Sequence, residues 1–400
     1  MNTTPASKPL DFDTLKAATA GTAAAFRSRT RLQPAGGEGD KVFPPTYAGA
    51  VYAKEDRQIN GLKVPCVLLD SVQAQANRLE EALQHALDNG TIKNIPVLNV
   101  DFTGIGLLDE VGRVSSLEAP HRIADAILRD SLHEGQPFRK SEIGKSLDQA
   151  SLQNATPLYK LCPTALVFGL WDSTGPKGGL GAKFQRALVS EIIGVNANIG
   201  VKTSSRIDPL GMRAAAKVIK KVDGTYELAG DKEKNGVSPS EVNHGNIPPD
   251  ISAVGGATID YAEQTIVLSL PALRKLRFPV EGKTMPERDA AARTVLVALA
   301  LTAATLAAES GFDLRSRCLL WPTGVMQWEL LETPGKAPTV FTITSKDAIQ
   351  LLEEAILVAE KCGLVWQKEP VRLTPSANLV ALLKRSQDIA AKAPAEMSAE

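Results

Sequence analysis

The sequence predicts an α+β fold, in which helices and strands mix along the chain without a regular order. Short apolar runs rich in β-branched residues are typical of buried strands, and amphipathic stretches behind capping residues are typical of helices. Both kinds of segment occur irregularly along 400 residues. A chain of this length has room for a sizeable core, as one large domain or two smaller ones.

We expect helices where apolar residues recur at helical spacing behind a capping residue. Ser71 is the expected N-cap of a helix that ends near Gly90. The stretch from Val295 to Ala308 is apolar but too short to span a membrane, so it predicts a buried helix. The expected helices cover residues 12–26, 71–90, 119–132, 181–193, 287–310, 346–362 and 376–389.

Strands are expected in the apolar or alternating runs between these helices. They cover residues 64–70, 94–102, 164–171, 257–270, 317–321 and 339–344. Residues 27–62 are rich in Arg, Gly and Pro and predict an irregular insertion, while the polar segment 223–256 predicts a functional or mobile loop. The tail 393–400 is small and polar, and we expect it to be disordered.

Composition excludes several classes of protein. The formal net charge is zero, so a nucleic-acid partner would have to be bound by a local patch. The four cysteines lie far apart and form no C-x-x-C pair, which argues against a structural zinc site. Few cysteines and no signal peptide predict a reducing, cytoplasmic location.

A glycine-rich segment, WDSTGPKGGLGAKFQRALVSEIIG (171–194), follows one of the expected strands. A strand, a glycine loop and a helix in this order are typical of nucleotide-binding loops, but both motifs fail here. Gly175 and Gly181 lie one residue too far apart for G-x-x-x-x-G-K-[ST], and Phe184 stands where G-x-G-x-x-G needs its third glycine. Two interpretations stay open: a general anion site at a helix N-terminus, or a tight turn.

The same part of the chain concentrates positive charge. Residues 173–221 contain nine basic and two acidic residues, a net charge of +7 in a neutral chain. This concentration indicates a polyanionic partner, and its alternative is a solvated helix face. The serines and the arginine of KTSSRID suit phosphate oxygens. The basic residues are Lys177, Lys183, Arg186, Lys202, Arg206, Arg213, Lys217, Lys220 and Lys221.

Residues suited to catalysis do not form a clear pattern. The four histidines have no metal-binding spacing, and the chain has no G-x-S-x-G motif and no evident carboxylate pair. His121 and Arg122 precede Asp125 at an expected helix start, either as a catalytic dyad or as a capped helix whose side chains reach a phosphate. We therefore expect no catalytic residue, no metal and no cofactor.

Five stretches, in order along the chain, together resemble the backbone subunit of the type I-G (formerly I-U) CRISPR effector complex, a member of the RAMP superfamily. The resemblance runs from about residue 30 to 280 and continues more weakly through the C-terminal helices. The stretches are LQPAGGEGDKVFPPTYAG, LLDSVQAQANRLEEAL, EAPHRIADAILRDS, ALVFGLWDSTGPKGGLGAKFQRALVSEIIG and SSRIDPLG.

The resemblance implies a single RRM-like (ferredoxin-like) palm domain over residues 1–392, with large inserted finger and thumb segments. Such Cascade-type subunits are not nucleases. They stack head to tail into a helical filament along the guide RNA (crRNA), and the thumb flips out a base at intervals. The implied partners are guide RNA, target DNA through the guide, further copies of the chain and other CRISPR effector subunits, without a membrane. Phosphate contacts suit this task because they carry no sequence information.

Carried onto this sequence, the resemblance suggests RNA contacts in the polar and basic parts of these stretches. Arg78 has a second interpretation as a partner of Glu81 on one helix face. The segment 235–256 and the strand 257–269 resemble the thumb, with Ile247 or Ile251 as the wedge between bases or, alternatively, packed under a loop. The expected RNA contacts are Arg29, Arg31, Lys41, Gln75, Asn77, Arg78, His121, Arg122, Lys177, Gly178, Gly179, Lys183, Arg186, Lys202, Ser204, Ser205 and Arg206.

Two other functions stay open from the residues alone. An enzyme that binds a phosphorylated metabolite or nucleotide at the glycine-rich loop 175–183 would bind a small phosphate ligand as a monomer or small closed oligomer. A self-assembling structural protein with an acidic partner would polymerise without RNA.

Overall fold

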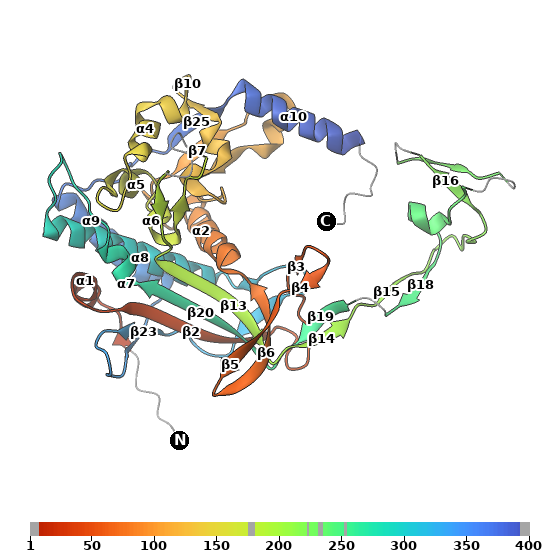
Figure 1. Ribbon diagram of the computed structural model, residues 1–400, viewed down its shortest axis with the longest axis horizontal. Helices are drawn as coiled ribbons and strands as arrows, with labels where there is room; N and C mark the ends of the chain where they lie inside the picture. Colours follow the sequence, from red (N-terminus) through yellow and green to blue (C-terminus); the bar gives the residue numbers. More distant parts are fainter. Residues whose placement is uncertain (1–7, 175–180, 222–223, 231–234, 252–253, 393–400) are drawn as a thin grey trace.

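Ten strands in the described part of the chain form one large sheet with helices packed on one face (Figure 1). The computed structural model describes residues 8–174, 181–221, 224–230, 235–251 and 254–392. Only the edge pair β1–β24 is parallel among the described strand pairs of this sheet. This mixed architecture confirms the α+β class. The strand order is β1 (Lys8–Pro9), β24 (Thr339–Thr342), β23 (Trp328–Leu331), β2 (Ala25–Pro34), β20 (Tyr261–Ser269), β13 (Leu188–Val195), β6 (Leu62–Asp70) and β5 (Lys54–Ile59), with β22 (Leu319–Pro322) joining β2 to β21 (Phe312–Asp313).

Alternating burial along the central strands separates a helix-covered face from an outer face. In β20, every second side chain from Ala262 to Leu268 is buried. In β2, Ser28 and Thr30 point inward, whereas Arg29 and Arg31, which alternate with them, point outward. Because successive side chains of a strand point to opposite faces, the arginines belong to the face that no helix covers.

Helix α8 (Pro286–Glu309) forms the centre of the core. It packs against α1 (Phe12–Ala20), α2 (Val72–Asp88) and α9 (Ser345–Lys361), and contacts α7 (Leu270–Arg274) near its own start. By length and composition α8 could cross a membrane, but its apolar stretch is mostly buried inside the protein. This burial is what the sequence predicted for the segment.

A second, smaller sheet lies beside the helices. Its order is β10 (Gln136–Pro137), β9 (Ser131–His133), β25 (Val371–Pro375), β7 (Leu98–Asp101) and β8 (Arg113–Ser115). Short helices surround it, and the last helix follows β25 directly (Figure 1). These helices are α3 (Ala126–Arg129), α4 (Glu142–Asp148), α5 (Thr156–Leu161), α6 (Thr164–Phe168) and α10 (Ala377–Lys392).

An arm of paired short strands extends from the end of β13 and the start of β20 (Figure 1). Its pairs follow one another outward and end near a 3-10 helix at Pro239–Val242. The polar segment 223–256 therefore holds ordered strands at its described residues. The pairs are β14 (Asn198–Val201) with β19 (Val254–Thr258), β15 (Ser204–Arg206) with β18 (Ile247–Asp250), and β16 (Val218–Lys220) with β17 (Tyr226–Leu228).

Four local predictions were wrong. Residues 164–171 form α6 and the short strand β11 (Leu170–Trp171), because a run that is buried on all sides has no period to separate helix from strand. Residues 181–193 form β12 (Lys183–Phe184) and most of β13, whose β-branched residues favour a strand. The expected irregular segment 27–62 contains most of β2, all of β5 and the start of β6, besides the small pair β3 (Thr46–Tyr47) and β4 (Val51–Tyr52). The expected helix 119–132 shrinks to a 3-10 turn and α3.

Candidate functional site

A cleft of about 570 Å³ opens where α2, the turn before α3, β11 and β12 meet. Asn77, His121, Arg122, Lys183 and Arg186 all line it, although they are far apart in the sequence. The cleft thus brings together five of the predicted RNA contacts. None of its described lining residues is an aspartate or glutamate.

The short pair β11–β12 sets which side chains are exposed at the cleft. Leu170 pairs with Phe184 and Trp171 pairs with Lys183. Leu170 and Phe184 are buried, so the strand period places Trp171 and Lys183 on the opposite, exposed side. The Lys183 Nζ lies 5.3 Å from the centre of the Trp171 ring. Apolar anchoring on one side therefore presents an aromatic ring and a cation together on the other.

Arg122 supports the wall of the cleft from inside the protein. It is 5% exposed, its Nε and Nη2 lie 2.7 Å from the two carboxylate oxygens of Glu80, and its Nη1 donates to the Gly169 carbonyl at 3.2 Å. Burial raises the pKa of Glu80 to about 7, opposed by the charge of Arg122 and by hydrogen bonds from Arg122 and Thr164. Three of the five N–H donors of Arg122 are thus used internally, which gives this residue a supporting role, and its predicted phosphate contact stays a prediction.

The turn before α3 is capped from within. Asp125 accepts hydrogen bonds from the backbone N–H groups of His121 and Ile127. Asp125 thus acts as a cap, as in the second interpretation of this segment. The exposed His121 side chain faces the cleft.

Arg186 carries a charge without a carboxylate partner among the described residues. Partial burial, together with the nearby charge of Arg122, lowers the pKa of Arg186 below its ordinary value. A phosphate in the cleft would offset both effects. Together with Lys183, this arginine makes the cleft suited to an anion.

Gly169 permits the close approach of these elements. Its φ is +89°, and a Cβ atom there would lie 2.8 Å from the Arg186 Cγ and 3.2 Å from the Phe184 carbonyl oxygen. A side chain at this position would therefore meet both strained backbone and occupied space. Gly169 lets β12 lie against the end of α6.

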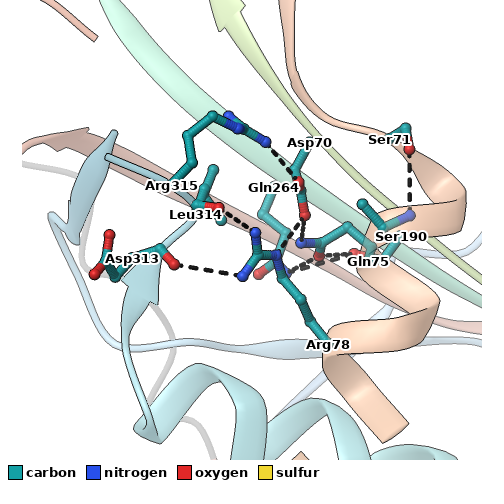
Figure 2. Close-up of polar contacts among 10 residues, drawn as sticks. Asp70, Ser71, Gln75, Arg78, Ser190, Gln264, Asp313, Leu314 and Arg315 are labelled. Carbon is teal, nitrogen blue, oxygen red and sulfur yellow. Dashed lines mark hydrogen bonds and ion pairs between the residues drawn. The ribbon is translucent and has the colours of Figure 1, made fainter. Parts of the chain in front are cut away.

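Gln75 and Arg78 lie outside the cleft, in a polar network between α2 and the large sheet (Figure 2). Gln75 is 4% exposed; it donates to Asp70 at 2.7 Å and accepts from Ser190 and Gln264. The predicted RNA contact of Gln75 is wrong here, because the amide is buried and used internally.

The Arg78 side chain extends from α2 to the end of β21 and the residue after it. It donates to Asp70 at 3.0 Å and to the carbonyls of Asp313 and Leu314. Arg315 contacts the other oxygen of Asp70 at 3.0 Å (Figure 2). The surface pair of Arg78 with Glu81 is therefore replaced by a tertiary ion pair.

The N-terminal basic residues lie away from the cleft. Arg29 makes a two-oxygen ion pair with Glu263, which raises the pKa of Arg29, and the Arg31 guanidinium lies 3.7 Å from the centre of the Tyr261 ring. The Lys41 Nζ donates to the Val201 carbonyl at the root of the arm. Their contacts with RNA stay predictions, and the structure gives each a partner within the chain.

The arm holds the remaining predicted residues. Ser204 and Ser205 are exposed, and Arg206 pairs across β15–β18 with Ile247, which is 39% exposed. Ile251 is 65% exposed, so it is not packed under a loop, whereas both interpretations of Ile247 stay open. Lys202 is also exposed. Lys177, Gly178 and Gly179 lie outside the described residues.

Sequence reasoning did not single out Trp171 and Gly169, which line the cleft, or Glu80, which is buried and pairs with Arg122 in its wall. Trp171 ended a run interpreted as a buried strand, and Glu80 stood on a helix face that looked ordinary. No group of three or more His, Cys, Asp or Glu side chains able to hold a metal occurs among the described residues.

One family model matches part of the chain. Residues 26–199 match the family model described as CRISPR-associated protein GSU0053. A solved structure, the crystal structure of Csc2 from Thermofilum pendens, is similar over 92% of this chain and 77% of that chain, with 12% sequence identity and a TM-score of 0.27. A TM-score this low does not establish a common fold. No curated protein matches the chain.

Proposed function

We propose that this chain is a non-catalytic backbone subunit of a type I-G CRISPR interference complex, which polymerises along the guide RNA and holds its sugar–phosphate backbone. The single observation that carries this proposal is the cleft. It contains Lys183 and Arg186 without a described acidic lining residue, and it lies within the part of the chain that matches the CRISPR-associated family. Such a site attracts phosphates and leaves base identity unread.

The order of the central elements supports an RRM-like palm. Along the chain, β2, α2, β13, β20 and α8 are followed by β22 and β23, with β5 and β6 inserted before α2. In the sheet, β22 and β23 lie beside β2, which is followed by β20 and β13. Two helices on one face of an antiparallel sheet in this order are typical of ferredoxin-like domains.

The arm supports a thumb. It grows from the β13–β20 hairpin, and the exposed Ile247 lies opposite Arg206 on it. The cleft lies at the start of β13 and the arm at its end, roughly 25 Å apart for a strand of this length. The wedge candidate Ile247 lies farther out, beyond the β14–β19 pair, so a backbone grip and a base wedge lie at opposite ends of one subunit, which suits a subunit that spans several nucleotides.

The test is native mass spectrometry of the chain co-expressed in the bacterial cytoplasm with guide RNAs of increasing spacer length. We expect RNA to co-purify and the number of copies to rise stepwise with the spacer. Lys183→Ala and Arg186→Ala should weaken RNA binding, and each lost phosphate contact should flatten the log–log salt dependence by about 0.7.

Matched controls are Lys346→Ala and Arg372→Ala, which remove exposed charges outside the cleft. These variants should bind RNA as the parent chain does. An RNA-free protein of fixed mass would refute the proposal, and binding of a small phosphate ligand by that protein would favour the enzyme alternative. Polymerisation without RNA would favour a self-assembling structural protein.

A further inference from the structure

Trp171 is exposed beside a cationic cleft, although burying an indole ordinarily stabilises a protein. It is 60% exposed and lines the cleft with Lys183 and Arg186. Exposure of so large an apolar group next to clustered polar groups is typical of binding surfaces.

The backbone that flanks Trp171 is held by contacts on both sides. The strand neighbour Leu170 is buried, and Asp172 on the other side pairs with Arg139 at 2.6 Å while its N–H donates to the Ala182 carbonyl. Arg139 is held in turn by Asp148. The backbone on both sides of Trp171 is therefore anchored, which fixes the position from which the indole is presented to the cleft.

The groups around the ring match the parts of one nucleotide. Lys183 and Arg186 supply cations for phosphate, and the amides of Gln73, Asn77 and Gln185 line the same cleft and can donate to and accept from ribose hydroxyls or base edges. The cleft volume falls in the range of pockets that enclose a small molecule.

We propose that Trp171 stacks on an unpaired base of the bound RNA, so that this cleft recognises a single-stranded nucleotide rather than a duplex. The inference rests on the proposed function and deepens it. The cations of the cleft hold the RNA backbone, and Trp171 in addition stacks on one base. Stacking tolerates any base because every base has a π-face. Paired bases in a duplex keep their faces covered by their neighbours and cannot reach the indole.

The test compares Trp171→Ala with Trp171→Phe, using a mixed-sequence single-stranded RNA and the same RNA annealed to its complement. We expect Trp171→Ala to weaken single-strand binding by about 5- to 150-fold and Trp171→Phe to weaken it much less. Duplex binding should change little in either variant. Trp321→Ala is the matched control, because Trp321 is 65% exposed on β22 and does not line the cleft.

A second readout is tryptophan fluorescence in a Trp321→Phe background. Binding of single-stranded RNA should quench the exposed Trp171, and the quenching should be absent when Trp171→Phe is added. Single-strand affinity of Trp171→Ala within twofold of the parent, with Lys183→Ala still impaired, would overturn stacking and leave the proposed function standing. Loss of RNA binding in the unaltered chain would overturn both.

Discussion

The outer face of the sheet and the cleft both carry cationic side chains, but they differ in what those side chains contact. On the outer face, Arg29 pairs with Glu263 and Arg57 with Glu191. Arg57 donates two hydrogen bonds to Glu191. The contacts of Arg57 with Glu191 and Glu55 raise its pKa above the ordinary value of arginine. On this face, a carboxylate on one strand thus pairs with an arginine on another strand.

In the cleft, the exposed cations have no such partner among the residues that the structure describes. The Lys183 Nζ lies over the Trp171 ring, and the pKa of Arg186 is lowered. The one arginine there with a carboxylate, Arg122, is buried behind the surface. The comparison teaches that the number of basic residues does not locate an anion site; the absence of nearby carboxylates does.

Among the tests of this comparison, we expect the largest effect when the buried ion pair between Arg122 and Glu80 is removed. Arg122→Met should leave Glu80 buried without its cation, and we expect a loss of about 3–5 kcal/mol in the free energy of unfolding. Urea denaturation at pH 7 measures it. The double variant Glu80→Gln with Arg122→Met should recover part of the loss, because no carboxylate then needs a partner. Equal stability of Arg122→Met and the parent would show that the pair does not support the cleft.

A smaller effect is expected from closing the space beside Gly169. Gly169→Ala combines a backbone strain with a clash against Arg186 and Phe184. Gly37→Ala is the matched control, because Gly37 has a similar φ of +91° and nothing within 4 Å of its Cβ position. Thermal or urea denaturation should show Gly169→Ala about 1–3 kcal/mol less stable than Gly37→Ala. RNA affinity should fall with Gly169→Ala alone, since Arg186 must move, and unchanged affinity would contradict the placement of Arg186 in the site.

Much of the fold was predictable where local signals agreed with burial. Ser71 caps α2 through the Ala74 N–H as expected, and the long apolar segment became the buried α8. Strand β2 was missed, because its inward positions hold the small polar residues Ser28 and Thr30 and its outward positions hold arginines. Its order is imposed by pairing with β20 and β22, which lie more than 200 residues away.

The site was predictable only in part, for a related reason. A basic cluster in the sequence does not show which charges are neutralised after folding. The structure divides the cluster between the cleft, which holds Lys183 and Arg186, and the arm, which holds Arg206. Glu80 neutralises Arg122 from a position 42 residues away, a pairing that no local pattern indicates.

The smallest effect is expected on the outer face of the sheet, where it tests whether the paired arginines there take part in RNA binding. Arg29→Ala removes an exposed ion pair, whose side chains are 58% and 20% exposed, so the free energy of unfolding should fall by only about 0.2–1 kcal/mol. Because Glu263 already neutralises this arginine, the salt dependence of RNA binding should keep the slope of the parent chain, measured by fluorescence anisotropy between low and high salt. A slope flattened by about 0.7, as for Lys183→Ala, would mean that RNA displaces the carboxylate and that the outer face, too, is part of the RNA path.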